Sequence, residues 1–121
     1  MESQQVKSLR RFFWLPVLGA LLGGCAKPPL YSWGHYEEII YVSYSAPGKL
    51  PLEAQVERLE ADFEKARSAN RPVPPGWHAN LGVLYYQLGK ADQAKQEFET
   101  EKANFPESAV FMDRLMASMK K

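Results

Sequence analysis

Few side chains in this sequence of 121 residues could carry chemistry. One cysteine, Cys25, and two histidines, His35 and His78, are too few for a metal site built from several Cys and His ligands. Ser43 and Ser108 lack the Gly-x-Ser-x-Gly surroundings of an activated nucleophile. We therefore expect a protein that is not an enzyme and that uses no metal or cofactor.

The remaining titratable groups favour a surface role. The glutamates from Glu53 to Glu64 are most simply a solvated helix face, because no pair of catalytic carboxylates can be singled out. His78 is interpreted as a packed residue between helices. The 15 Lys and Arg residues nearly balance the 14 Asp and Glu residues, so the basic surface that nucleic acid requires is not expected. The length and the 45% hydrophobic content indicate one modest domain.

The N-terminus has the pattern of a secretory signal. Lys7, Arg10 and Arg11 precede an apolar run over residues 12–22, which is shorter than the roughly 20 residues that span a bilayer. Small residues and Cys25 follow. We expect residues 1–24 to be a signal peptide.

Leu22-Gly23-Gly24-Cys25 resembles the bacterial lipobox. The resemblance implies cleavage before Cys25, a diacylglyceryl group on its sulfur, and a further acyl chain such as palmitate on its amine. Several acyl chains anchor a protein stably. Ala26 is not the Asp that retains such lipoproteins in the inner membrane, so the resemblance points to the outer membrane and a body facing the periplasm. Residues 25–30 would form a short tether. The alternative is an uncleaved signal anchor with an incidental cysteine.

The segments after the tether are predicted to be helical. Five apolar residues recur at steps of three and four, which predicts a helix over residues 51–69: Leu52, Val56, Leu59, Phe63 and Ala66. Residues 107–119 would form a terminal helix with four apolar residues inward: Met112, Leu115, Met116 and Met119.

Residues 75–108 resemble a tetratricopeptide repeat of about 34 residues. The matching positions are Leu81, Gly82, Tyr85, Gly89, Ala94, Phe98 and Pro106. Gly82 and Ala94 would allow two helices to cross closely, and Gly89 would permit the turn between them. Two positions depart from the pattern, His78 and Glu101. The predicted fold class is all-α, a tetratricopeptide-like stack of about five antiparallel helices over residues 31–121.

The first repeat, over residues 33–69, is less regular. Its first helix would run from Trp33 to about Tyr44 with Trp33, Tyr36 and Ile40 facing inward. A β-hairpin over residues 38–44 is the competing interpretation, because Ile39 to Val42 have strong strand propensity.

Over residues 31–116 the chain resembles a family of small Gram-negative lipoproteins catalogued as a domain of unknown function. The resemblance rests on Tyr31-Ser32-Trp33-Gly34, on the segment 74–79, and on Glu101-Lys102 followed by the segment 105–112. It implies association with sister lipoproteins of the envelope, one of them similar to a curli-type export pore component. An assembly role follows as an expectation, since fold analogy supplies no activity.

In tetratricopeptide stacks the first helix of each pair lines a concave surface. The candidate partner-binding residues are therefore Asn80, Val83, Tyr86, Gln87 and, on the last helix, Arg114, with Ala79 beside them. Asn80 and Arg114 are similar in position to residues that grip a peptide carboxylate. Glu38, however, would repel a carboxylate. The alternative is that Arg114 binds no peptide and is either a solvated residue or one paired with Glu101. A second candidate surface is aromatic: Tyr31, Trp33, Tyr36, Tyr41 and Tyr44.

Three functions remain open at this point. The first is a non-enzymatic outer-membrane lipoprotein that acts as a protein–protein interaction or assembly module for an envelope or secretion complex. The second is a regulatory lipoprotein that binds and activates a periplasmic enzyme such as a cell-wall synthase. The third is a carrier for a short peptide.

Overall fold

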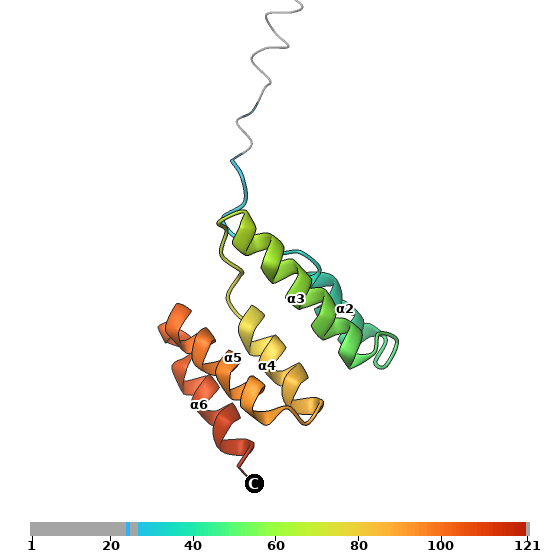
Figure 1. The fold of residues 1–121 in the computed structure, drawn as a ribbon, viewed down its shortest axis with the longest axis vertical. Helices are drawn as coiled ribbons and strands as arrows, with labels where there is room; N and C mark the ends of the chain where they lie inside the picture. The colour runs from blue at the N-terminus through green and yellow to red at the C-terminus, as the bar shows by residue number, and fades with distance from the viewer. Residues whose placement is uncertain (1–23, 25–26, 121) are drawn as a thin grey trace, which may run out of the picture.

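The computed structural model describes residue 24 and residues 27–120. In that part of the chain it contains α-helices and a short 3-10 turn but no strand (Figure 1). The elements are α2 (Tyr36–Ser45), α3 (Leu52–Ser68), α4 (Trp77–Gln87), α5 (Ala91–Asn104), the 3-10 turn η1 (Pro106–Ser108) and α6 (Ala109–Ser118). The predicted all-α class is confirmed. Cys25, and the predicted signal peptide apart from Gly24, lie outside the described residues.

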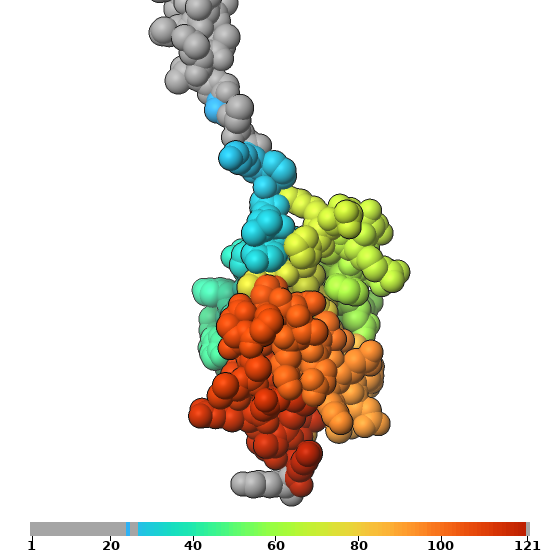
Figure 2. Space-filling view, turned by 90° about the vertical axis from the view of Figure 1, so that its left-hand side faces the viewer, coloured from blue at the N-terminus to red at the C-terminus, as the bar shows by residue number. Residues whose placement is uncertain are grey.

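The helices pack in chain order. α3 contacts α4, α4 packs most extensively against α5, and α6 lies along α5. Figure 2 shows the tether leaving the body at one end of the molecule and the C-terminal residues at the other. None of the helices in the described part of the chain is long and apolar enough to cross a membrane.

The core is built from all five helices. Its buried apolar side chains include Leu59 of α3, Phe98 of α5 and Met112 of α6, each at most 1% exposed. Leu115, Met116 and Met119 pack against this core, as predicted for the terminal helix. That helix begins at Ala109, after η1, and not at Glu107. A single core therefore joins α2 and α3 to α4, α5 and α6.

The α4–α5 hairpin has the predicted close crossing. A Cβ atom added to Gly82 would lie 2.6 Å from Cε1 of Phe98 and 3.1 Å from the carbonyl oxygen of Ala94. Only glycine fits at that distance. Gly89 has a φ of 75°, which glycine adopts without strain, and it reverses the chain between α4 and α5.

The end of α3 is a hydrogen-bonded turn. The N–H of Arg71 donates to the carbonyl of Ala66 at 2.9 Å, and the N–H of Asn70 donates to the carbonyl of Arg67 at 3.0 Å. Asn70 has a φ of 51°, the left-handed conformation that ends many helices. The turn directs the chain into Pro72 and Val73 and onward to α4.

The first helix differs from its prediction in start and in phase. Residues 38–44 are helical, so the β-hairpin interpretation is wrong, and α2 begins at Tyr36 and not at Trp33. Ile39 is fully buried, whereas Ile40 is half-buried. Trp33 precedes the helix, remains 40% exposed and stacks on Tyr36 with ring centroids 6.3 Å apart.

Tertiary contacts explain this shift. The N–H of His35 donates to Oδ2 of Asp62 in α3 at 2.6 Å, which fixes where α2 begins. Gly34 has a φ of 49°, and a Cβ atom there would collide with the Asp62 carboxylate. Contacts with α3 therefore override the local strand propensity of the segment.

Candidate partner-binding site

A groove opens between α2, the α2–α3 loop, the start of α3, and α4. Its volume is about 520 Å³. The residues that line it are Ile40, Ser43, Tyr44, Pro47, Gly48, Leu50, Pro51, Leu52, Gln55, Asn80, Val83, Leu84 and Gln87. None of them carries a charged side chain, so the groove is suited to an uncharged occupant.

The groove brings together three of the residues predicted from the sequence. Asn80, Val83 and Gln87 line it from α4. Tyr86, also on α4, is 44% exposed but does not line the groove. Arg114 is exposed on α6 and does not line it either. The groove therefore contains the predicted amide side chains of Asn80 and Gln87 but not the predicted guanidinium group of Arg114.

The amide of Asn80 is the most informative polar group in the groove. Its Nδ2 atom is buried and has no hydrogen-bond partner among the described residues. A buried donor without a partner costs free energy, and native structures contain few of them. The atom is shielded from solvent, so the Asn80 side chain would rotate into the groove to meet a carbonyl oxygen of an occupant.

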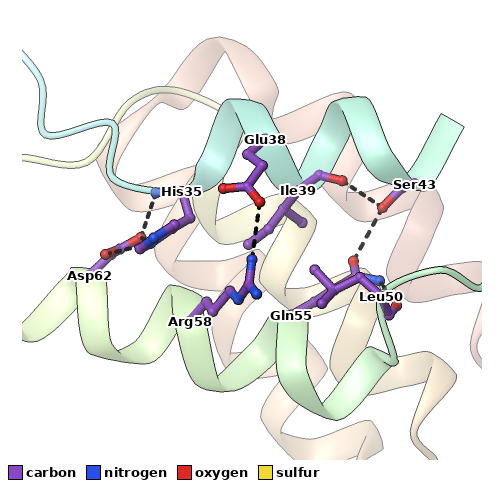
Figure 3. Close-up of polar contacts among 8 residues, drawn as sticks. All are labelled: His35, Glu38, Ile39, Ser43, Leu50, Gln55, Arg58 and Asp62. Carbon is purple, nitrogen blue, oxygen red and sulfur yellow. Dashed lines mark hydrogen bonds and ion pairs between the residues drawn. The ribbon is translucent and has the colours of Figure 1, made fainter. Parts of the chain in front are cut away.

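Gln55 holds the wall of the groove opposite α4. It is 5% exposed, and its Nε2 atom donates to the carbonyl of Leu50 at 2.8 Å. Oγ of Ser43 lies 3.2 Å from Oε1 of Gln55 and 2.8 Å from the carbonyl of Ile39 (Figure 3). This network joins α2, the loop and α3, so the groove has a fixed wall. Helical periodicity does not reveal this wall, because the hydrogen bond that Gln55 donates to Leu50 depends on the path of the loop.

The charged residues near this wall pair with each other. Nη1 of Arg58 donates to Oε1 of Glu38 at 3.1 Å, on the outer side of the α2–α3 pair (Figure 3). Glu38 is therefore held by Arg58 and does not line the groove.

The histidines have structural partners. Nδ1 of His35 lies 2.9 Å from Oδ2 of the buried Asp62. His78 is 5% exposed, and its Nδ1 atom lies 2.6 Å from Oε2 of Glu97. The predicted packing of His78 between helices is therefore confirmed. No group of three or more His, Cys, Asp or Glu side chains that could hold a metal occurs in the part of the chain described here.

Two glutamates have roles that the sequence analysis missed. Glu60 accepts a hydrogen bond from the hydroxyl of the buried Tyr85, so one member of the predicted solvated face is engaged. Burial, with the hydrogen bond to Glu60, raises the pKa of Tyr85. Glu101 is 2% exposed and accepts hydrogen bonds from the N–H groups of Gly76 and Ala79. Its suggested partner Arg114 is not among these contacts, so that pairing is wrong.

The aromatic residues divide into two groups. Tyr31 contacts Phe105 edge-on with ring centroids 6.4 Å apart, and Tyr36 packs against the core. Tyr41 and Tyr44 are 71% and 84% exposed. Tyr44 also lines the groove, so the aromatic surface and the groove meet at the end of α2.

A protein-family model described as a domain of unknown function, DUF4810, matches residues 30–115. Neither the curated proteins nor the solved structures contained a match.

Proposed function

The chain belongs to the DUF4810 family, and we propose that it is a non-enzymatic outer-membrane lipoprotein that holds a partner protein of an envelope or secretion complex. The partner segment would lie in the groove between α2 and α4. The family description names no activity, so the proposal depends on the site itself.

The observation that carries the proposal is the unpaired Asn80 amide in an uncharged groove. Nδ2 of Asn80 has no partner among the described residues, and the groove around it has a volume of about 520 Å³. A peptide backbone supplies carbonyl acceptors at regular intervals, and apolar side chains of a peptide would contact Val83 and Leu84. We infer an uncharged, extended segment of a partner as the occupant.

A helical-repeat architecture supports the same role. The α4–α5 hairpin has a glycine at the crossing and a glycine at the turn, as tetratricopeptide repeats do. Stacks of such hairpins bury a continuous core and leave a groove for partners. We propose that this body is a short stack of that kind.

The N-terminal segment supports the proposed location. Leu22-Gly23-Gly24-Cys25 resembles a lipobox, and lipid on Cys25 would hold the body at the membrane. Cys25→Ala should release the protein from the outer-membrane fraction into the periplasm. Retention of the variant in that fraction would contradict the proposed anchor.

Capture of partners tests the groove. Envelopes crosslinked in vivo should yield a specific partner with the unaltered chain, and Asn80→Ala combined with Val83→Glu should lose it. Arg114→Ala serves as the matched control, since that residue lies outside the groove. Co-purification of an export pore component or sister lipoprotein supports the assembly role. Recovery of a cell-wall synthase would instead support the regulatory alternative, and equal capture by all variants would refute the groove.

A further inference from the structure

A second depression lies where the tether meets the body. Its volume is about 570 Å³. Half-buried aromatic side chains of Tyr31, Phe63 and Phe105 line it, together with Arg67, Asn70 and Arg71. We refer to it as the tether-end pocket. It combines an apolar lining with two guanidinium groups, a composition suited to an anionic group attached to an apolar body.

The turn that ends α3 positions both arginines. Asn70, in the left-handed conformation, closes the helix so that Arg71 follows within the same turn as Arg67. Nη2 of Arg71 donates to the carbonyl of Pro29 at 2.5 Å, and the N–H of Ser32 donates to the carbonyl of Pro72 at 2.8 Å. The tether is thus attached to the body beside the pocket.

The arginines retain capacity for an anion. Nη2 of Arg67 donates to Oε2 of Glu64 at 2.9 Å, and both side chains are largely exposed. Arg71 forms no ion pair with a carboxylate in the described part of the chain, and neither does Lys27. A guanidinium group has five N–H donors in a plane, which match the oxygens of a phosphate. Unused donors therefore remain on both arginines.

The length of the tether limits what this end can reach. Cys25 lies four positions before Pro29 in the sequence, and an extended chain advances at most about 3.6 Å per residue. Four steps of chain can therefore span no more than about 14 Å from the Pro29 carbonyl that Arg71 binds. If Cys25 carries the acyl chains of the proposed function, on which this inference rests, the pocket is held close to the headgroup layer. That layer is about 5–8 Å thick on each side of the hydrocarbon core.

From this geometry we propose that the tether-end pocket binds the phosphate of a membrane phospholipid headgroup through Arg67 and Arg71. The contact would fix the orientation of the body on the membrane. Helix α3 connects the two sites, because its start lines the groove and its end lines the tether-end pocket. A helix of 17 residues is about 25 Å long, so the groove would open away from the membrane, toward partners.

The test measures how close each end of α3 lies to lipid headgroups. The lipidated full chain is reconstituted into vesicles of phosphatidylethanolamine and phosphatidylglycerol that contain a headgroup-linked quencher. A fluorophore is attached at Ser68→Cys, at the tether end, or at Ser45→Cys, at the groove end. Acylation of Cys25, the one cysteine in the sequence, leaves each introduced thiol as the labelling site. Quenching is expected at position 68 and not at position 45.

Charge variants then separate binding from proximity. Arg67→Gln and Arg71→Gln should each lower the equilibrium constant for docking about fivefold, the effect of one cation near an anionic surface. Glu64→Gln removes the carboxylate that occupies Arg67 and should raise the docked fraction. Lys49→Gln, in the distant α2–α3 loop, removes the same charge as a control and should change nothing. Circular dichroism confirms that each variant keeps its helices.

Three results would overturn the inference. Unchanged quenching in Arg67→Gln and Arg71→Gln would exclude these residues as the headgroup site. A parallel decrease in Glu64→Gln and Arg67→Gln would assign both residues a structural role. Loss of quenching with inorganic phosphate at a concentration where sodium chloride of equal ionic strength has no effect would make free phosphate the preferred ligand. Failure of the unaltered chain to float with vesicles would instead refute the lipid anchor, so the two failures are distinguishable.

Discussion

The carboxylate of Glu101 in α5 accepts a hydrogen bond from the backbone N–H of Gly76 at 2.6 Å, directly before α4 begins. Its second oxygen accepts from the N–H of Ala79 at 3.2 Å. The first N–H groups of a helix have no partners within the helix, and a negative charge there is favourable. Glu101 therefore stabilises the start of the helix that lines one side of the groove.

Replacing Glu101 should destabilise the body. Glu101→Ala leaves two backbone donors unsatisfied in a site that is 2% exposed, and should lower the free energy of unfolding by about 3 kcal/mol. Glu101→Gln keeps one acceptor oxygen and should lower the free energy of unfolding by a smaller amount. Urea unfolding measures both variants. Glu99→Ala, an exposed neighbour on α5, is the control, and equal losses at positions 99 and 101 would contradict the role of Glu101.

The crossing of α4 and α5 predicts the effect of adding one methyl group. Gly82→Ala would place Cβ 2.6 Å from Cε1 of Phe98 and should reduce stability by about 1–3 kcal/mol. Phe98→Leu removes the ring atoms that collide. The double variant should therefore lose less unfolding free energy than the two single variants lose together. Thermal unfolding of the three proteins gives this comparison. Strict additivity would show that the two residues do not contact each other.

Tyr85 predicts a loss of stability in alkali. Burial, followed by the hydrogen bond to Glu60, raises the pKa of Tyr85 above its ordinary value of 10.0. The unfolded chain then releases its proton at lower pH than the folded chain. The protonated Tyr85 therefore stabilises the folded protein fully at pH values below 10.0, and this stabilisation is lost as the pH rises above 10.0.

Tyr85→Phe should consequently show a smaller decrease in unfolding free energy between pH values of about 9 and 11 than the unaltered protein. Tyr86→Phe, at an exposed position one residue away, provides the control and should follow the unaltered protein. Chemical unfolding at several pH values gives the slopes. The same slope for all three proteins would show that Tyr85 does not titrate differently in the folded state.

The part of the fold that the sequence predicts is the part governed by local periodicity. Leu52 to Ala66 define α3 by spacing alone, and the small residues Gly82 and Ala94 mark a helix crossing. The phase of α2 could not be obtained in this way. It depends on the contact of His35 with Asp62, which is 27 residues away in the chain.

The groove shows the same division. Asn80, Val83 and Gln87 lie on one face of α4 and follow from helical spacing. The opposite wall follows from the path of the α2–α3 loop, which Gln55 fixes through the carbonyl of Leu50. A hydrogen bond to a loop carbonyl leaves no periodic signal, so that wall could not be predicted.

This wall gives a further prediction. Gln55→Leu keeps the volume of the side chain but removes both hydrogen bonds, so the loop over residues 46–51 should open more often. Hydrogen exchange should show faster exchange in that loop and an unchanged rate in α5. Uniformly faster exchange along the chain would indicate global destabilisation and contradict a local role for Gln55.

Site-specific photo-crosslinking in living cells tests whether the groove between α2 and α4 holds a partner segment. A photoreactive amino acid at Val83 lies in the groove, whereas one at Glu57 lies on the exposed face of α3 as the control. If the groove holds a partner, we expect a discrete adduct with one envelope protein from position 83, none from position 57, and loss of the adduct when Asn80→Ala is added. No adduct from position 83, or the same adducts from both positions, would contradict it.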